Sequence, residues 1–303
     1  MSLRNRLQPT KSRHPRRNWA RLRLATSPAK PGRVRLATFN HPSMLNDCPV
    51  KTGLNKAYSS HIRFERRNDG DVVIKSVGAQ AIFGEINFHR EMKNHGLPAM
   101  EGKIEKGELV LNFIPDAQTL GDCETPENFK KFGQAVRAMH EISFSAPSHF
   151  NENGARVKIT WNEFIQQTIE FGLKKQRERN GFTEEESRQI VFAINSHQFE
   201  EPKIISLLHG DLHPNNVLFV NDQTILFDTA DWIASGNKLY DLALVALDAK
   251  SENLQAFIKG YGEDFTKNKN ELNAYLLLRA LERHPNKFET YIPQTVEKIL
   301  QTM

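Results

Sequence analysis

Three side chains that suit phosphoryl transfer lie within residues 209–228. Residues 209–216 read HGDLHPNN, so Asp211 is followed, after four other residues, by Asn216. Asp228 comes directly after a short predicted strand, 224–227. Phosphoryl transfer needs a carboxylate near the attacking hydroxyl and oxygen ligands that hold Mg²⁺ against the phosphates. This spacing can place a base beside a metal ligand, and a second Asp can reach the same ion from the next hairpin.

The segment HGDLHPNN resembles the catalytic loop of the aminoglycoside phosphotransferase family, whose relatives include choline, fructosamine and homoserine kinases. That loop has the form His-Gly-Asp-Leu-His-Pro-x-Asn, and residues 209–216 match every fixed position. Gly236 and the segment YDLA at 240–243 match the family's next landmark. Phe227 and Thr229 depart mildly from the Ile-Asp-Trp or Ile-Asp-Phe often found there. The resemblance covers about residues 45–265, and such a long ordered match rarely arises by chance.

The resemblance implies an α+β, bilobal, protein-kinase-like fold with a small antiparallel-sheet N-lobe and a larger, mainly helical C-lobe. The implied activity is ATP-dependent transfer of the γ-phosphate to a hydroxyl of a small molecule, such as an aminoglycoside, a sugar or an amino alcohol. The resemblance makes Asp211 the catalytic base, makes Asn216 and Asp228 ligands of Mg²⁺, and makes Asp241 a support of the lower lobe.

Two histidines flank the expected base. His209 with Asp211 could indicate a different kind of metal site, but Pro214 and the carboxamide of Asn216 suit a hard magnesium site better. The family uses the histidines at these two positions to brace the loop, so we interpret His209 and His213 as structural.

The phosphate-binding cation is expected upstream. Lys75 ends the β-branched run VVIK, where a kinase-like fold places its phosphate-binding lysine. Without the downstream loop, a solvated strand-end lysine would be the default interpretation. By resemblance its carboxylate partner is Glu85, with Glu91 as second choice, because the distance from Glu85 to Pro98 matches the family's spacing from this glutamate to Gly-x-Pro.

The nucleotide should also meet two stretches of backbone. The segment TGLNK at 52–56 resembles the family's phosphate-covering loop, so Gly53 is predicted to contact the nucleotide. The strand 109–112 and the residues after it resemble the interlobe hinge. Backbone groups of Asn112, Phe113 and Ile114 are therefore predicted to bind the adenine.

The pattern of secondary structure agrees with two lobes. Segments 57–64 and 72–74, joined by a turn with Asp-Gly at its tip, predict a hairpin. A helix over 79–94, a strand over 109–114 and a helix beginning at Thr125-Pro126 follow. Thr183 and Glu186 form a capping box, and the chain from residue 239 is mostly helical. We therefore expect an N-lobe over 45–115 and a C-lobe over 116–303.

The net charge of +5 arises from one end of the chain. Residues 1–35 hold eleven of the 41 Lys and Arg and no Asp or Glu, which leaves 30 basic against 36 acidic residues in 36–303. The mildly acidic body excludes a uniformly basic nucleic-acid binder and suits a cationic substrate weakly. For the basic extension over 1–44, a targeting segment, a disordered tail and an over-long start all stay open.

No apolar run is long enough to span a bilayer, so we expect no membrane partner. The only cysteines are Cys48 and Cys123, which have no metal-ligand spacing, so a reducing cytoplasm is the default compartment.

The expected acceptor is small, because twelve residues separate Asp228 from Asp241 and leave no room for a long peptide-binding activation segment. A helical insert over about 145–200, with Trp161, Phe164 and Phe171, could wall its pocket. The acidic run at 184–186 is interpreted as a charged first helical turn. Three alternatives stay open: a nucleotide-binding pseudokinase or scaffold, a protein-modifying kinase-like enzyme, and a nucleic-acid binder acting through residues 1–35.

Overall fold

The computed structural model describes residues 61–303 except 180, 221, 284–290 and 303. All of these belong to one compact unit, Cys48–Met303. Gly53 and the basic extension lie outside the described residues. Within the described residues, no helix combines the length and the apolar character that crossing a membrane requires.

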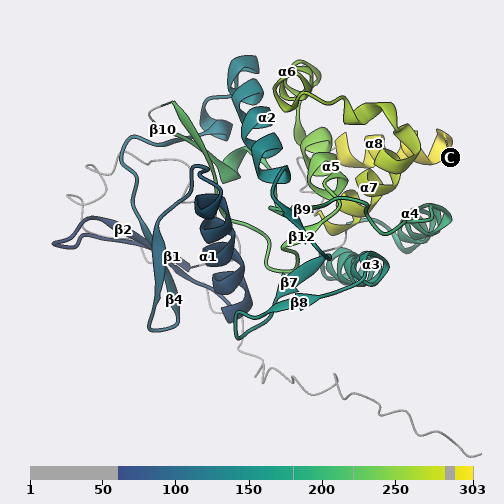
Figure 1. Ribbon diagram of the computed structural model, residues 1–303. Coiled ribbons are helices and arrows are strands. Elements are labelled where there is room, and N and C mark those ends of the chain that lie inside the picture. The colour runs from purple at the N-terminus through teal and green to yellow at the C-terminus, as the bar shows by residue number, and fades with distance from the viewer. Residues whose placement is uncertain (1–60, 180, 221, 284–290, 303) are drawn as a thin grey trace, which may run out of the picture. The chain divides into compact units, whose positions relative to one another are not determined.

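The first sheet has four antiparallel strands in the order β1-β2-β4-β3 (Figure 1). Strands β1 (His61–Glu65) and β2 (Val72–Ser76) form the predicted hairpin, with Ile62 paired to Lys75. Strand β4 (Glu108–Asn112) is two residues shorter at its end than expected. Strand β3 (Gly102–Glu105) was not predicted, because its residues are almost all exposed and show no apolar alternation.

Helix α1 (Ala79–Asn94) has the predicted bounds and packs on this sheet. Ile82 and Ile86 join Leu109 and Leu111 of β4 in one apolar cluster, which also includes Ile225 from the other half of the chain. The helix ends at His95 and Gly96, and the positive φ of 71° at Gly96 is the conformation for which glycine is favoured.

A small three-stranded sheet carries the chemistry-bearing segment. Its order is β11 (Gln223–Leu226), β10 (Val217–Val220) and β5 (Gln118–Thr119). The loop 208–213 and the 3₁₀ turn η3 (Pro214–Asn216) connect β9 (Ile205–Leu207) to β10. Because β10 and β11 pair in register from Val217 with Leu226, the chain returns to the level of Asn216 as it reaches Asp228.

A third sheet corrects one expectation. The segment beginning at 145 was expected to be helical, but it contributes strands to a sheet in the order β6-β9-β12-β7-β8. The new strands are β6 (Ser143–Phe144), β7 (Ser148–Phe150), β8 (Arg156–Lys158) and β12 (Ser235–Gly236). The side chain of Asn151 closes the β7–β8 turn by accepting hydrogen bonds from the N–H groups of residues 153 and 155. Helix begins only at 161.

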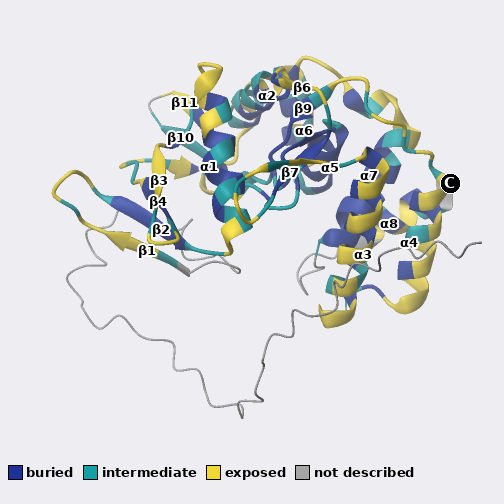
Figure 2. Ribbon diagram, turned by 60° about the horizontal axis from the view of Figure 1, so that its bottom comes forward, coloured by how far each residue is buried: buried dark blue, intermediate teal, exposed yellow. Residues whose placement is uncertain are grey.

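The rest of the chain is helical. The helices are α2 (Pro126–His140), α3 (Trp161–Arg179), α4 (Glu184–Ser196), α5 (Leu239–Asp248), α6 (Ser251–Tyr261), α7 (Lys269–Glu282) and α8 (Tyr291–Thr302). Thr125 and Thr183 cap α2 and α4 as predicted. One large core joins these helices, and α3 and α4 expose their outer faces (Figure 2). Helices α2 and α6 approach so closely that a Cβ at Gly133 or Gly260 would overlap backbone of the facing helix.

Candidate active site

Asp211, Asn216 and Asp228 lie together, as their spacing predicted. The side-chain nitrogen of Asn216 donates to the Asp211 carbonyl oxygen at 2.9 Å, to Asp211 Oδ2 at 3.1 Å and to the Asp228 carbonyl oxygen at 3.1 Å. Asn216 is buried, whereas the side chain of Asp211 is 38% exposed. The amide of Asn216 therefore joins both aspartates, and Asp211 can reach a ligand.

Lys75 and Glu85 meet Asp228 from the first sheet and α1. Lys75 Nζ lies 2.5 Å from Glu85 Oε2 and 2.5 Å from Asp228 Oδ1. The backbone N–H of Asp228 donates to Glu85 Oε1 at 3.3 Å. Asp228 has a φ of 58°, a conformation uncommon for a residue with a side chain, and such outliers persist where surrounding contacts hold them. Three charged groups thus meet at one place: Lys75 from β2, Glu85 from α1 and Asp228 from the loop after β11.

Electrostatics keep this group charged. Burial by itself would lower the pKa of Lys75, but the carboxylates of Glu85 and Asp228 raise it well above its ordinary value. Burial likewise would raise the pKa of Glu85, but Lys75 and then His89 bring it down to about 2. Glu85, and not the second candidate Glu91, is the carboxylate that pairs with Lys75.

Asp211 also remains ionised. Burial would raise the pKa of its carboxyl, but the neighbouring His213 and then Arg283 and Arg279 lower the pKa below its ordinary range. His213 Nε2 lies 3.5 Å from Asp211 Oδ2. An ionised carboxylate can accept a hydrogen bond from a hydroxyl, which is the state that a base requires.

Asp241 and His209 brace the loop. Asp241, which is fully buried, accepts hydrogen bonds from the backbone N–H of His209 at 2.9 Å and of Gly210 at 2.7 Å. His209 Nδ1 accepts from the N–H of Asp211 at 3.3 Å, so the proton is on Nε2, which donates to the Phe227 carbonyl at 2.8 Å. Burial lowers the pKa of His209, which favours this neutral form.

A second buried network supports the loop from α7, and sequence reasoning missed it. Arg279 donates to the Gly210 carbonyl at 2.7 Å and to Glu282 Oε2 at 2.6 Å. Tyr240 donates to Glu282 Oε1 at 2.9 Å and accepts from Trp232 Nε1 at 2.8 Å. The available signal was one Arg and one Glu three residues apart in an otherwise apolar helical segment, LLLRALE at 276–282, because such charges must be paired if they are buried.

The residues predicted to bind the adenine lie at the end of β4, which includes Asn112, and directly after it. The N–H of Asn112 donates to the Glu101 carbonyl at 2.8 Å, and the N–H of Phe113 donates to the Asp71 carbonyl at 2.9 Å. These two donors are already used within the fold. The N–H of Ile114 has no backbone partner among the described residues, so it is the hinge donor that stays available.

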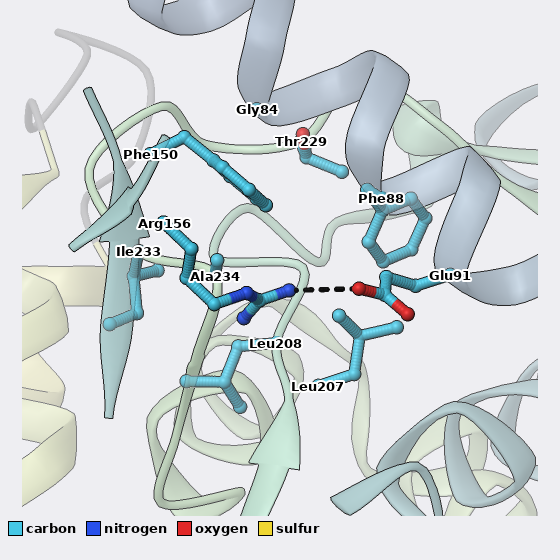
Figure 3. A pocket seen from close by; sticks show the side chains of 10 residues that line it. All are labelled: Gly84, Phe88, Glu91, Phe150, Arg156, Leu207, Leu208, Thr229, Ile233 and Ala234. Atoms are coloured by element: carbon cyan, nitrogen blue, oxygen red, sulfur yellow. Dashed lines mark hydrogen bonds and ion pairs between the residues drawn. The ribbon is translucent and has the colours of Figure 1, made fainter. Parts of the chain in front are cut away.

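Glu91 has a different partner from the one considered for it. Its carboxylate accepts from Arg156 of β8 at 3.1 Å, and the guanidinium lies 4.2 Å from the Phe144 ring centre and 4.8 Å from that of Phe150. Figure 3 shows this pair beside a cavity lined also by Phe88. The cavity encloses only about 10 Å³, room for about one water, so it is no ligand site.

The residues at the centre fit a magnesium ion. Carboxylate and carboxamide oxygens are the ligands that Mg²⁺ prefers, and one or two protein ligands suffice when phosphates supply others. The bonds made by the side-chain nitrogen of Asn216 leave its oxygen free to bind a metal, and Asp228 Oδ2 has no hydrogen-bond partner among the described residues. A softer metal would favour a cluster of His and Cys ligands. In the described part of the chain, no group of three His, Cys, Asp or Glu is placed to hold a metal.

Comparison with known proteins adds the family. The model of the fructosamine kinase family matches residues 99–303, more than two thirds of the chain. The chain belongs to the fructosamine kinase family. This kinase transfers phosphate from ATP to a hydroxyl of a small molecule. No curated protein matches its sequence significantly.

Solved structures show the same fold. A thermostable mutant of aminoglycoside phosphotransferase APH(4)-Ia is 16% identical, with a TM-score of 0.61 over 82% of the kinase and 92% of its own chain. Choline kinase LicA from Streptococcus pneumoniae is 16% identical, with a TM-score of 0.57 over 80% of the kinase and 90% of its own chain. A proposed fructosamine-3-kinase from Thermobifida fusca YX-ER1 is 18% identical, with a TM-score of 0.57 over 81% of the kinase and 90% of its own chain. The α+β kinase-like fold expected from the sequence is confirmed.

Proposed function

We propose that Asp211, Asn216, Asp228, Lys75 and Glu85 form the active site of this kinase. The observation that supports this assignment is their convergence: one amide joins the two aspartates, and one ammonium joins Asp228 to Glu85. The groups come from elements as far apart as residues 75 and 228, so no single local motif explains the arrangement. Positioning and neutralisation of charge are the main tasks of such a site.

In the proposed reaction the acceptor hydroxyl oxygen attacks the γ-phosphorus of ATP. The bond from that phosphorus to the β,γ-bridging oxygen breaks, ADP leaves, and the hydroxyl proton passes to the carboxylate of Asp211. Lys75, held by Glu85, binds phosphate oxygens. Asn216 and Asp228 would hold Mg²⁺, which neutralises charge on the phosphates. The N–H of Ile114 would bind the adenine, and Gly53 stays a predicted contact outside the described residues.

Fructosamines are the acceptor class that we propose to test first, because of the family. Aminoglycosides, sugars and amino alcohols are the next classes to test. A thermostable APH(4)-Ia mutant has been solved as a ternary complex with ADP and hygromycin B. We propose the cytoplasm as the compartment, because the two cysteines indicate no dependence on disulfides.

Replacement of the proposed base tests the assignment. Asp211→Asn in the full chain should lower kcat by about 10²–10⁴-fold, because the proton acceptor is lost. ADP release in a coupled assay measures turnover, and calorimetry should show ATP binding retained. Asp222→Asn is the matched control, since Asp222 lies in the exposed β10–β11 turn with a φ of 63° that Asn tolerates. An Asp211→Asn enzyme within a few-fold of wild type would refute the role.

A further inference from the structure

Lys175 of α3 is a half-buried cation that rests on two aromatic rings. Its Nζ lies 4.3 Å from the ring centre of Phe171 and 5.7 Å from that of Trp232. The two rings are 5.5 Å apart and tilted by 42°. Among the described residues, no hydrogen-bond acceptor or carboxylate lies within bonding distance of the ammonium. A cation on aromatic faces gains about 0.5–2 kcal/mol, and it keeps donors for a ligand.

This cation lies in the electrostatic neighbourhood of the proposed base. The charges that act on Lys175 are those of Glu282, Arg179, Asp211 and Arg279, in that order after burial. By contrast, the charges that act most on Lys75 are those of Glu85 and Asp228. The geometry agrees with this difference, because Lys175 lies over the ring of Trp232, whereas Lys75 lies against Glu85 and Asp228 at the proposed phosphate site.

The aromatic wall is tied to the catalytic loop. Trp232 follows Asp228 by four residues, and its Nε1 donates to Tyr240, which donates to Glu282. Glu282 pairs with Arg279, which donates to the carbonyl of the residue before Asp211. This chain of hydrogen bonds fixes the ring of Trp232 relative to Asp211.

The carboxylates near Lys175 already have other partners. Glu282 accepts from Arg279 and Tyr240, and Asp211 accepts from Asn216 and lies beside His213. Burial lowers the pKa of Lys175, as expected for an ammonium that has lost water without gaining a direct ion pair. An anionic ligand group would restore the missing interaction.

We propose that Lys175 binds a carboxylate or phosphate group carried by the hydroxyl-bearing acceptor, with Phe171 and Trp232 as the walls of this subsite. The proposal rests on the proposed role of Asp211. The mildly acidic body suggested a cationic acceptor, and this proposal reverses that expectation. The aromatic pair that could receive a cationic acceptor is already occupied by Lys175. Acceptors with a quaternary ammonium group in this position are repelled.

Matched acceptors test the subsite. The full-length kinase is assayed with fructosamines made from ethylamine, glycine and aminoethyl phosphate, which present a neutral, a carboxylate and a phosphate group. The same comparison uses sorbitol, gluconate and sorbitol 6-phosphate. We expect kcat/KM to be about tenfold or more higher for at least one anionic form, mainly through KM, and the two anions tell carboxylate from phosphate.

Variants assign the preference to one side chain. Lys175→Met should lower the ratio of kcat/KM between anionic and neutral acceptors about tenfold, and Lys175→Arg should restore most of it. Lys174→Met is the matched control and should keep the wild-type ratio, because Lys174 is 74% exposed and its one ion pair among the described residues is with Glu178. A wild-type preference for neutral or cationic acceptors, or an unchanged ratio in Lys175→Met, overturns the proposal.

A binding measurement separates this proposal from the proposed function. If no acceptor is phosphorylated, the proposed function fails, and the subsite is judged by NMR of ¹³C-dimethylated lysines. The Lys175 resonance, assigned by its loss in Lys175→Arg, should shift on titration with inorganic phosphate and with acetate, while the Lys174 resonance stays in place. A selective shift with either anion supports the subsite, and the absence of a shift with phosphate and with acetate overturns it.

Discussion

Two lysines of this kinase, Lys75 and Lys175, occupy opposite electrostatic environments. Lys75 is buried between two carboxylates at 2.5 Å, and they raise its pKa. Lys175 is half-buried on two aromatic rings, and burial lowers its pKa. The first ammonium already has its counter-charges from the protein, whereas the second lacks a direct one among the described residues.

The difference shows how one fold separates its common and its variable parts. ATP is the common substrate of such kinases, and the groups that we propose for its phosphates are held by a closed set of protein contacts. The acceptor differs between kinases, and in our proposal its subsite stays incomplete until the substrate supplies the missing charge. A preorganised charge network favours catalysis, and an unfilled one favours selectivity.

Removal of Lys75 should have the largest effect. Lys75→Met leaves Glu85 buried without its cation, so we expect kcat/KM for ATP to fall about 10³-fold and the free energy of unfolding to fall by about 3–5 kcal/mol. Steady-state kinetics and urea unfolding measure the two quantities. Lys103→Met, at an exposed lysine of β3, is the control and should change neither. Normal ATP kinetics in Lys75→Met would refute the proposed role of Lys75 in binding the phosphates of ATP.

The Lys75–Glu85 pair should also make stability depend on acid. The pKa of Glu85 is about 2 in the folded protein against 4.5 as its reference. The unfolded state therefore binds the proton more readily, so this contribution is present above about pH 4.5 and is lost as the pH falls toward 2. We expect about 2–3 kcal/mol less stabilisation at pH 3 than at pH 7 from this group. Urea unfolding at both values should show a smaller pH difference in Glu85→Gln than in wild type. Equal pH differences would contradict the assignment.

The Arg156–Glu91 contact should have a smaller effect, because it positions α1 from outside the site. A double-mutant cycle with Arg156→Ala and Glu91→Ala should give a coupling energy of about 1 kcal/mol in stability, and each single variant should raise KM for ATP about three- to tenfold. The pair Arg63–Glu108, also joined by a short ion pair but with Arg63 50% exposed, is the control and should couple by less than about 0.5 kcal/mol. Stability loss without a change in KM would leave Arg156 a purely structural residue.

The smallest expected effect is a pH dependence of acceptor binding. Only protonated Lys175 attracts an anion, and its pKa is lowered, so KM for an anionic acceptor should begin to rise at a pH below the usual lysine range. We expect this rise to be absent in Lys175→Arg, because arginine stays protonated. The neutral acceptor of the same pair is the reference. A KM ratio independent of pH in wild type would remove the contrast between the two lysines.

Prediction from sequence succeeded where the pattern is local. The bounds of α1, the caps at Thr125 and Thr183 and the hairpin before Lys75 follow from nearby residues. It failed at β3, an exposed strand without apolar alternation, and at 143–158, where the strands have two or three residues each. There β6 and β7 pair with the distant strands β9 and β12, which no local pattern reveals. The roles assigned to Asp211, Asn216 and Asp228 stay proposals, although the structure brings these residues together.

Residue types and their spacing were enough to predict the fold class and the meeting of Asp211, Asn216 and Asp228, because a loop and its following hairpin bring these residues together over a short length of chain. Which distant charges join them depends on the packing of the folded chain. Arg279 lies 69 residues beyond Gly210, and Lys175 reaches Trp232 from another helix. Packing of helices into the common core sets these approaches, and packing depends on the whole chain at once.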